Sequence, residues 1–134
     1  MEEFARTMKK IKHISLKSLK QRAWKLQSEY VRKIENYICF TCGKQLTKQT
    51  SDCSHYIHKA CLDFDLINLH CCCTRCNRFL HGNLGVYAEC LIAEYGEEAI
   101  AELRQRANQV KKFTIIELQD LIAKYTKLLV KGER

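Results

Sequence analysis

The sequence predicts an α+β protein in which a small metal-stapled core is preceded by a long helix and followed by further helices. Two CxxC pairs, the first starting at Cys39 and the second ending at Cys76, enclose a segment rich in Cys and His but short of aliphatic residues. On both sides of that segment, apolar residues recur in steps of three or four, which is typical of amphipathic helices. The middle of the chain is therefore expected to be held by metal more than by burial.

Length and charge narrow the class of protein. The chain has 134 residues, a usual size for one domain, and 46% of them are apolar. Its net charge is +8, concentrated in residues 1–38. This basic N-terminal part beside a neutral Cys/His centre suggests nucleic-acid binding. Charge alone leaves open a plainly solvated, Lys-rich helix face.

The nine cysteines are expected to be reduced thiols, some of them bound to zinc. No apolar run is long enough for a signal peptide or a membrane span, so no membrane partner is expected. Cys53, Cys61 and Cys90 are interpreted as free buried thiols.

The N-terminal part divides into an arm and a helix. Residues 1–13 are predicted to be a basic flexible arm, and residues 14–38 a basic helix, regular over about 16–36. Ser15 or Ser18 can cap it. Its apolar stripe is predicted to dock on the core and consists of Leu16, Leu19, Ala23, Leu26, Tyr30, Ile34 and Tyr37. DNA phosphates are the predicted partners of the basic residues on its other sides, Lys17, Lys20, Arg22, Lys25, Arg32 and Lys33.

Residues 39–83 are predicted to form the core, and residues 84–134 a helical region. We expect a metal-binding knuckle, a polar loop over residues 45–52, a strand from Cys53 to Ile57, and a helix beginning at Asn77–Leu80. Further on, Gly96 is a suitable residue to follow a helix. Glu97 and Glu98 open the next one, and Thr114–Glu117 has the pattern of a capping box.

The two CxxC pairs predict a structural zinc site, because tetrahedral zinc takes four soft ligands and leaves no position open when all are thiolates. The predicted ligands are Cys39, Cys42, Cys73 and Cys76. Cys71 and Cys72 are rivals for the third position, but only the pair Cys73/Cys76 gives a CxxC followed by Asn. His58 is either a loop residue or a ligand replacing one cysteine.

The order of His and Asn around this zinc site is typical of a ββα-metal (HNH/treble-clef-like) nuclease core. There, His55 would take a proton from the water that attacks phosphorus, and a hard cation, Mg²⁺ or Mn²⁺, would stabilise the developing charge. Asn77 and His81 are four residues apart, and on one helix they would point the same way and clamp that cation. Asn68 would buttress the loop that carries His55. Taken singly, His55 could be a surface residue and Asn77 a helix cap.

These motifs, taken in order, resemble the phage lambda NinG/Rap recombination-protein family over about residues 14–130. The resemblance rests on the first CxxC with Gly43-Lys44, on Ser54-His55-Tyr56-Ile57, on Asn68, and on the run from Cys73 to Asn83. More distantly, the chain resembles junction resolvases of the phage endonuclease VII type. The resemblance implies an HNH-type endonuclease that nicks branched double-stranded DNA, such as Holliday junctions and D-loops, in the cytoplasm of a bacterial host. Because paired cuts on a junction are made most simply by a two-fold dimer, we expect a homodimer formed through helical segments. Phage recombination proteins are expected as further partners, and Arg75 and Arg78 as additional phosphate contacts.

The sequence departs from this pattern twice. Many HNH sites have Asp immediately before the catalytic His, where this chain has Ser54, so the carboxylate ligand of the cation is unassigned. Asp52, Asp63 and Asp65 are the candidates for it, and Ser54 itself is another ligand to consider. A basic residue is expected in the loop after His55, where the chain has Asp63. Two other functions stay open: a non-catalytic zinc module that binds DNA or a recombination partner, and an HNH nuclease with sequence preference.

Overall fold

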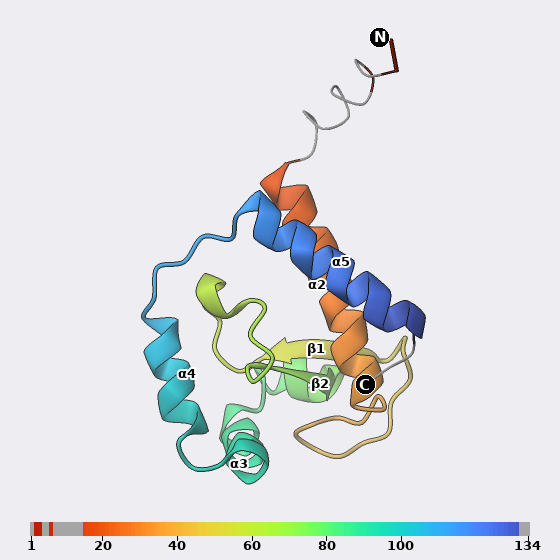
Figure 1. The fold of residues 1–134 in the computed structure, drawn as a ribbon. Coiled ribbons are helices and arrows are strands. Elements are labelled where there is room, and N and C mark those ends of the chain that lie inside the picture. The colour runs from red at the N-terminus through yellow and green to blue at the C-terminus, as the bar shows by residue number, and fades with distance from the viewer. Residues whose placement is uncertain (1, 4–5, 7–14, 132–134) are drawn as a thin grey trace.

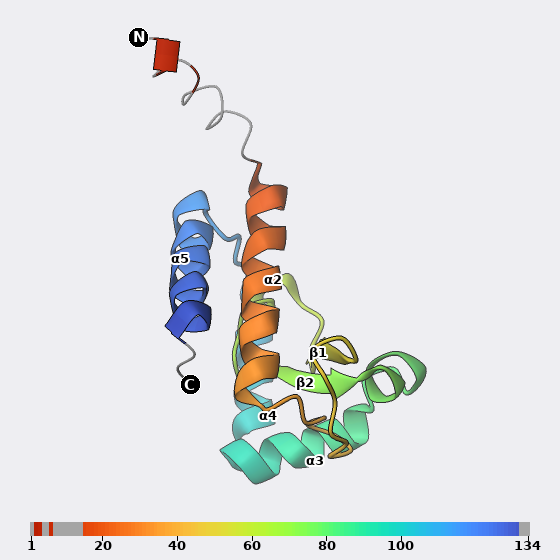
Figure 2. The same ribbon diagram turned by 90° about the vertical axis from the view of Figure 1, so that its right-hand side faces the viewer.

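The computed structural model describes residues 2–3, 6 and 15–131, so the predicted arm over residues 1–13 lies largely outside the described residues. The predicted α+β class is confirmed (Figures 1 and 2). In chain order the elements are α2 (Leu16–Ile34), β1 (Ser51–His55), the 3₁₀ helix η1 (Ala60–Leu62), β2 (Leu69–Cys73), the π-helical turn η2 (Arg75–Phe79), α3 (Leu84–Tyr95), α4 (Ala99–Ala107) and α5 (Ile115–Lys131).

The long helix α2 ends at Ile34, slightly earlier than predicted, because Asn36 and Tyr37 have positive φ angles of 55°. Of the two predicted caps, Ser15 is the one used: its Oγ accepts a hydrogen bond from the Ser18 backbone N–H at 3.1 Å. The sheet packs against part of α2, and α5 runs alongside it in the same direction (Figure 2). As a result, α2 is covered on two sides.

The fully buried stripe of α2 differs from the predicted one. It follows a strict four-residue step and consists of Leu19, Ala23, Gln27 and Val31. Leu16 is 52% exposed. Gln27 was missed because a polar residue does not count in an apolar pattern. Its Nε2 donates to the Phe64 carbonyl at 2.9 Å and to the Tyr125 hydroxyl at 3.1 Å, so it links the loop after η1 to α5.

The sheet is a two-stranded antiparallel hairpin, with Ser51 opposite Cys73 and His55 opposite Leu69. The strand that carries His55 begins and ends two residues earlier than predicted, so His55 is its last residue. Every residue of β2 is buried. The hairpin is closed by the long 56–68 loop, which contains η1 and returns to β2 at Leu69.

The C-terminal helices form as the sequence predicts. α3 ends before Gly96, which has φ 99°, and α4 begins directly after Glu98. The capping box is present, since the Thr114 hydroxyl accepts from the Glu117 N–H at 3.2 Å and the Glu117 carboxylate accepts from the Thr114 N–H at 3.3 Å.

Two apolar clusters hold these layers together. One joins the cysteine-rich hairpin to α3 and α4 through Leu62, Tyr87, Leu91 and Leu103. The other joins α2 to α5 through Leu19, Ala23, Phe64 and Leu118. No helix in the described parts of the chain is both long and apolar enough to cross a membrane.

The regular helix that the sequence predicts directly after Cys76 does not form. The chain makes only the short π-helical turn η2, and then His81 and Asn83 take left-handed φ angles of 50° before α3 starts. Three hydrogen bonds close this bend: the Gly82 N–H donates to the Cys76 carbonyl at 2.9 Å and to the Asn77 carbonyl at 3.1 Å, and the Leu80 N–H donates to the Arg75 carbonyl at 2.8 Å.

Candidate functional site

Four cysteine sulfurs come together beside the hairpin. The ligand atoms of Cys39, Cys42, Cys73 and Cys76 all lie within 4.8 Å of one another, and this is the one such group of Cys, His and acidic residues among the described residues. Around a tetrahedral zinc with Zn–S bonds of about 2.3 Å, neighbouring sulfurs are about 3.8 Å apart. The Cys42 and Cys73 sulfurs are 3.7 Å apart. The four side chains therefore fit a zinc ion, and Cys71 and Cys72 lie outside the group.

Hydrogen bonds to these sulfurs favour thiolate at the first ligand. The Cys39 sulfur accepts from the Cys73 backbone N–H at 3.3 Å and lies 3.3 Å from the Thr41 hydroxyl. A hydrogen bond from the Cys72 thiol, with smaller contributions from Thr41 and backbone amides, lowers the pKa of Cys39 to about 3. Cys72, one of the two rival ligands, is thus a hydrogen-bonding neighbour of the site rather than a member of it.

The predicted base His55 is held from two sides at the end of β1. Its ring stacks on Trp24 of α2, with centroids 4.7 Å apart and planes 19° apart. Its Nε2 lies 3.2 Å from the Asp63 carbonyl oxygen. Because a carbonyl only accepts hydrogen bonds, Nε2 carries the proton in the neutral ring, and Nδ1 is left as a lone-pair acceptor.

The surroundings of His55 favour this neutral form. Burial is the main cause that lowers the pKa of His55 below its ordinary value of 6.5, and the Asp63 carbonyl and carboxylate oppose the shift. The ring lines a hollow of about 310 Å³ together with Lys17, Lys20, Gln21, Trp24, Asp63 and Phe64. In that hollow the Lys20 ammonium is 2.9 Å from the Asp63 carboxylate. A neutral imidazole beside two lysines is an arrangement that can accept a proton near a phosphate.

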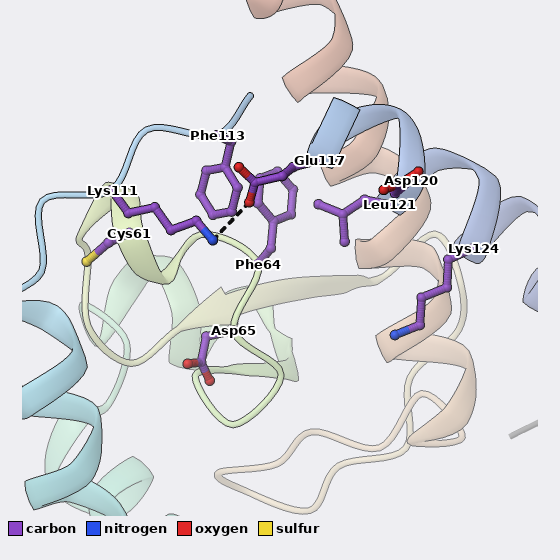
Figure 3. Close-up of a pocket in the computed structure, with 9 residues that line it drawn as sticks. All are labelled: Cys61, Phe64, Asp65, Lys111, Phe113, Glu117, Asp120, Leu121 and Lys124. Atoms are coloured by element: carbon purple, nitrogen blue, oxygen red, sulfur yellow. Dashed lines mark ion pairs between the residues drawn. The ribbon is translucent and has the colours of Figure 1, made fainter. Parts of the chain in front are cut away.

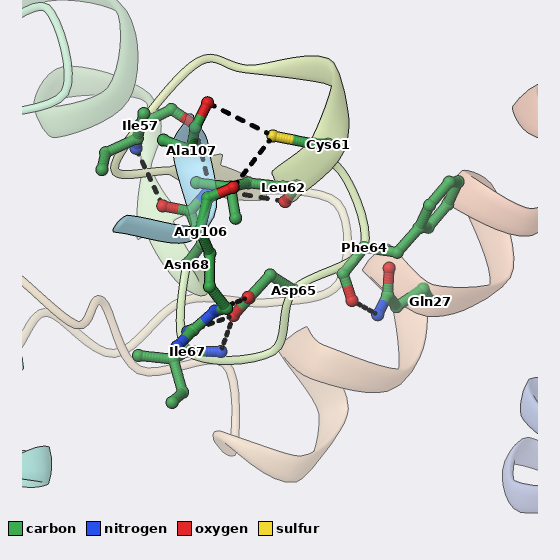
Figure 4. Close-up of polar contacts among 10 residues, drawn as sticks. All are labelled: Gln27, Ile57, Cys61, Leu62, Phe64, Asp65, Ile67, Asn68, Arg106 and Ala107. Carbon is green, nitrogen blue, oxygen red and sulfur yellow. Dashed lines mark hydrogen bonds and ion pairs between the residues drawn. The ribbon is translucent and has the colours of Figure 1, made fainter. Parts of the chain in front are cut away.

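Asn68 is fully buried and braces the chain that follows His55 (Figure 4). Its Oδ1 accepts from the Ile57 N–H at 2.8 Å, and its Nδ2 donates to the Ile57 carbonyl at 2.9 Å and the Leu62 carbonyl at 3.5 Å. Its own carbonyl accepts from the Tyr56 N–H at 3.0 Å. These contacts are those of the buttress that the sequence predicts.

Asp52 and Asn77 meet at a second hollow, of about 340 Å³, also lined by Arg32 and Arg78. The Asn77 Nδ2 donates to the Asp52 Oδ2 at 3.1 Å, and the Arg78 guanidinium lies 3.5 Å from the same oxygen. With Nδ2 so directed, the Asn77 amide oxygen and the Asp52 carboxylate are oxygen donors of the kind Mg²⁺ and Mn²⁺ prefer. Trp24 lines both this hollow and the one at His55.

Three expectations about the cation ligands change. The helix that was to align His81 with Asn77 does not form, and His81 is exposed in the bend after η2. Ser54 is 2% exposed, so its side chain faces the interior rather than a cation site. Asp65 is paired with Arg106, at 2.8 Å to Nε and 3.3 Å to an Nη (Figure 4). Asp52 is therefore the carboxylate that the fold brings to Asn77.

A hollow beside α5 contains none of the residues predicted for catalysis or zinc. It measures about 430 Å³ and lies between Phe64, Phe113 and α5, with Lys111 paired to Glu117 at 2.9 Å across its mouth (Figure 3). Asp65 and Cys61 are on its wall. The Cys61 thiol donates to the carbonyls of Arg106 and Ala107, so it ties η1 to α4.

Four of the eight predicted DNA-binding residues line one of the two hollows. Lys17 and Lys20 line the hollow at His55, and Arg32 and Arg78 line the hollow at Asp52. Arg32 also donates to the carbonyls of Ser28, Lys48 and Ser51, which gives it a structural role. The remaining four are exposed and line neither hollow, and they are Arg22, Lys25, Lys33 and Arg75.

Sequence reasoning missed a buried pair behind the hairpin. His70 is 3% exposed and stacks on Phe40 with centroids 3.8 Å apart. Its Nδ1 lies 2.8 Å from the Glu35 carboxylate, and its Nε2 lies 3.0 Å from the Ile67 carbonyl. Glu35 also accepts from the Cys71 N–H at 3.0 Å. The pair fastens the end of α2 to β2, and no spacing motif connects Glu35 with His70.

Fold and site together define a class: a small α+β protein with a cluster of four cysteines that could hold a metal ion, packed on a β-hairpin. Comparison with known proteins gives the particular family. The family described as "Bacteriophage Lambda NinG protein" matches residues 1–134, and the chain belongs to that family. This agrees with the resemblance found in the motifs.

Individual relatives agree with this assignment. The chain is 36% identical over 94 residues to "Protein ninG" of Escherichia phage 933W and 35% identical over 94 residues to "Protein ninG" of Escherichia phage lambda. Each match covers 68% of this chain, and 46% and 45% of the respective relatives. The chain thus spans about half the length of the curated relatives it matches. No solved structure matches.

Proposed function

We propose that the chain is a metal-dependent, HNH-type endonuclease that nicks branched DNA recombination intermediates such as Holliday junctions and D-loops. The observation that carries the proposal is the fixed orientation of the His55 ring. Its Nε2 is directed at the Asp63 carbonyl 3.2 Å away, which leaves Nδ1 as the basic atom of a ring that lines a hollow together with Lys17 and Lys20. An imidazole fixed in this way is suited to act as a general base.

In the proposed reaction, Nδ1 of His55 takes a proton from water, and the resulting hydroxide attacks the phosphorus of a backbone phosphate. The bond between that phosphorus and the 3′ oxygen breaks, and the leaving 3′ oxygen takes up a proton from water. Asp52 and Asn77 would hold a Mg²⁺ or Mn²⁺ ion, which supplies Lewis-acid stabilisation of the charge that develops on the phosphate and leaving oxygen. Lys17 and Lys20 contact the flanking phosphates. Asn68 holds the loop in place, and the products carry 5′-phosphate and 3′-hydroxyl ends.

In this proposal the four cysteines hold zinc as a structural ion, and the hairpin followed by η2 forms the ββα-metal core. Four thiolates leave no position open for substrate, so the zinc fixes the frame rather than the reaction. Two ligands precede β1, one ends β2 and one lies in η2. Zinc therefore fixes η2, and with it Asn77, beside the strand that carries Asp52 and His55.

The proposed enzyme acts as a homodimer together with other proteins. Paired nicks on a two-fold symmetric junction are made most simply by a homodimer, and phage recombination proteins are the expected partners. Exposed apolar residues on α5, Ile115 at 47% and Ile116 at 71%, provide a surface on which two copies can meet.

The test is nicking of a labelled four-way junction with Mg²⁺ by wild type, His55→Asn and His58→Asn. Asn at position 55 keeps a donor for the Asp63 carbonyl but removes the base. His58 is exposed, and its ring centroid is 5.8 Å from that of His55, so it is the matched control. Loss of nicking by His55→Asn alone, with binding and zinc content unchanged, supports the proposal. A wild-type protein that binds the junction and never nicks it refutes the nuclease.

The same substrates separate the alternatives. A non-catalytic zinc module would bind the junction with no metal-dependent product, and His55→Asn would change nothing. An HNH nuclease with sequence preference would cut a linear duplex of the same sequence as readily as the junction. The proposed enzyme nicks the branched substrate in preference to the linear one.

A further inference from the structure

We propose that Phe79 is a wedge that stacks on an exposed base at the branch point of the DNA. The proposal deepens the proposed function and rests on it for the identity of the substrate. Phe79 ends the π-helical turn η2, and its side chain is 76% exposed. The one other aromatic residue among the exposed large hydrophobic side chains of the described chain is Tyr95, at 43%. A ring exposed to this degree has its faces open to stack on a partner.

The charges around Phe79 indicate the kind of partner. Arg75 and Arg78 belong to the same turn, both are exposed, and the Arg78 side chain is 70% exposed. An exposed ring on the same turn as two exposed arginines matches nucleic acid, because guanidinium groups bind phosphates while an aromatic face binds a base. An apolar protein partner would instead have to cover both arginines.

The turn that presents the ring is fastened to the proposed metal frame. Cys76, a member of the four-cysteine group, and Asn77 immediately precede Arg78 and Phe79 in the turn. The Gly82 N–H donates to the carbonyls of both Cys76 and Asn77, and the Asn83 amide lies 3.7 Å from the Cys76 sulfur. In Figure 2 the segment between β2 and α3 projects from the side of the molecule. The ring is thus presented on a closed bend, two residues from Asn77.

A branch point is the DNA feature that such a ring fits. In continuous duplex both faces of every base pair are covered by neighbours, so stacking on one requires the duplex to be kinked. Where strands exchange, bases have an open face or are unpaired. An aromatic side chain there stacks without first breaking a stack. A wedge two residues from Asn77 places the proposed cation site next to the branch.

The experiment measures affinity rather than cutting. The full chain, loaded with zinc and carrying His55→Asn to prevent nicking, is titrated against a fluorescent four-way junction and a linear duplex of the same sequence. Phe79→Leu keeps an apolar side chain but removes the stacking face, and Phe79→Tyr restores the face. Val110→Ala is the control, because Val110 is 97% exposed and is followed by Lys111 and Lys112. Size-exclusion chromatography follows the oligomeric state of each variant.

We expect Phe79→Leu to lower affinity for the junction by roughly five- to a hundredfold, which is the range for loss of one base–aromatic stack. The affinity of Phe79→Leu for the duplex should stay unchanged. The affinities of Phe79→Tyr and of Val110→Ala for both the junction and the duplex should also stay unchanged. Equal loss on junction and duplex, or no loss on either, overturns the wedge. A change of oligomeric state in Phe79→Leu also overturns it, since the ring would then belong to a protein interface.

The outcome is separable from that of the proposed nuclease. If the wild-type chain never nicks but Phe79→Leu loses affinity for the junction selectively, the proposed role of Phe79 is supported and the proposed nuclease activity is refuted. If the wild-type chain nicks and Phe79→Leu keeps the same preference for the junction, the proposed nuclease activity is supported and the proposed role of Phe79 is refuted.

Discussion

Replacing Asn68 by Ala is predicted to destabilise the chain and to disable the loop that holds His55. The Asn68 side chain satisfies both backbone groups of Ile57, at 2.8 Å and 2.9 Å, and is 0% exposed. Alanine leaves those two groups without partners and opens a small cavity beneath the loop. This loop includes Asp63, whose carbonyl directs the His55 ring.

The size of the effect follows from the two lost partners. A buried polar group left unsatisfied costs about 1–3 kcal/mol, and two would cost about 2–6 kcal/mol. Because Ile57 is half-buried, water recovers part of this loss. We therefore expect the free energy of unfolding to fall by about 2–4 kcal/mol, a large share of the roughly 5–15 kcal/mol of an ordinary domain.

The assay is urea unfolding of the zinc-loaded chain, with Asn108→Ala as control. Asn108 follows α4 and is exposed, so its loss should change stability by less than about 0.5 kcal/mol. Asn68→Asp is a second variant. It keeps the acceptor for the Ile57 N–H but directs a carboxylate oxygen at the carbonyls of Ile57 and Leu62. This variant should become more stable, relative to wild type, as the pH falls and its new carboxyl is protonated.

An Asn68→Ala chain that unfolds at the same urea concentration as wild type would refute this reasoning. An Asn68→Asp chain whose stability relative to wild type does not depend on pH would also contradict it, because the hydrogen bonds to the two carbonyls would then not matter. If Asn68→Ala lowers stability as predicted, it should also slow nicking at temperatures where the variant is folded.

Three further predictions concern the base, the zinc and the loop. Since burial lowers the pKa of His55 below 6.5, the nicking rate should be level from about pH 8 down to 6.5 and fall only below that; a decline centred above pH 7 would contradict it. Cys76→Ser should reduce bound zinc, measured by atomic absorption, and lower the thermal midpoint, whereas Cys61→Ser should retain a full equivalent; equal zinc in both would exclude Cys76 as a ligand. Asp63→Asn keeps the backbone carbonyl but releases Lys20, so affinity for DNA, measured by fluorescence anisotropy at low salt, should rise; unchanged affinity would show that Lys20 does not contact phosphate.

Much of the frame could be predicted from local chemistry. The spacing of the two CxxC pairs was enough to select Cys73 over Cys71 and Cys72, because a knuckle positions its two sulfurs through one tight turn. The capping box at Thr114 and the Gly96 terminus were predictable for the same reason, since each depends on a few neighbouring residues. Asn68 was predictable as a buttress only by its place in the motif order.

The differences arise where distant parts of the chain decide the outcome. The bend at His81 is made by the left-handed residues around Gly82 and by bonds back to Cys76 and Asn77, so a helix period counted from Asn77 does not continue through it. Gln27 is buried because α5 packs on that face of α2, and Tyr125 of α5 accepts a hydrogen bond from the Gln27 amide. An apolar pattern in the sequence would place a polar residue at the surface instead. The Glu35–His70 pair joins residues 35 positions apart. Hydrophobic periodicity contains no information on any of these contacts.

The central claim is that the four cysteines hold a structural zinc ion, that Asp52 and Asn77 hold a second cation at the DNA, and that His55 acts as the base beside it. The most direct measurement is a crystal structure of the His55→Asn chain with a four-way junction and Mn²⁺, with anomalous scattering recorded for zinc and manganese separately. We predict zinc among the four cysteine sulfurs, and manganese bound by Asp52 and Asn77, contacting a backbone phosphate within reach of residue 55. Manganese absent from Asp52 and Asn77, or bound where residue 55 cannot reach the phosphate, would contradict the account.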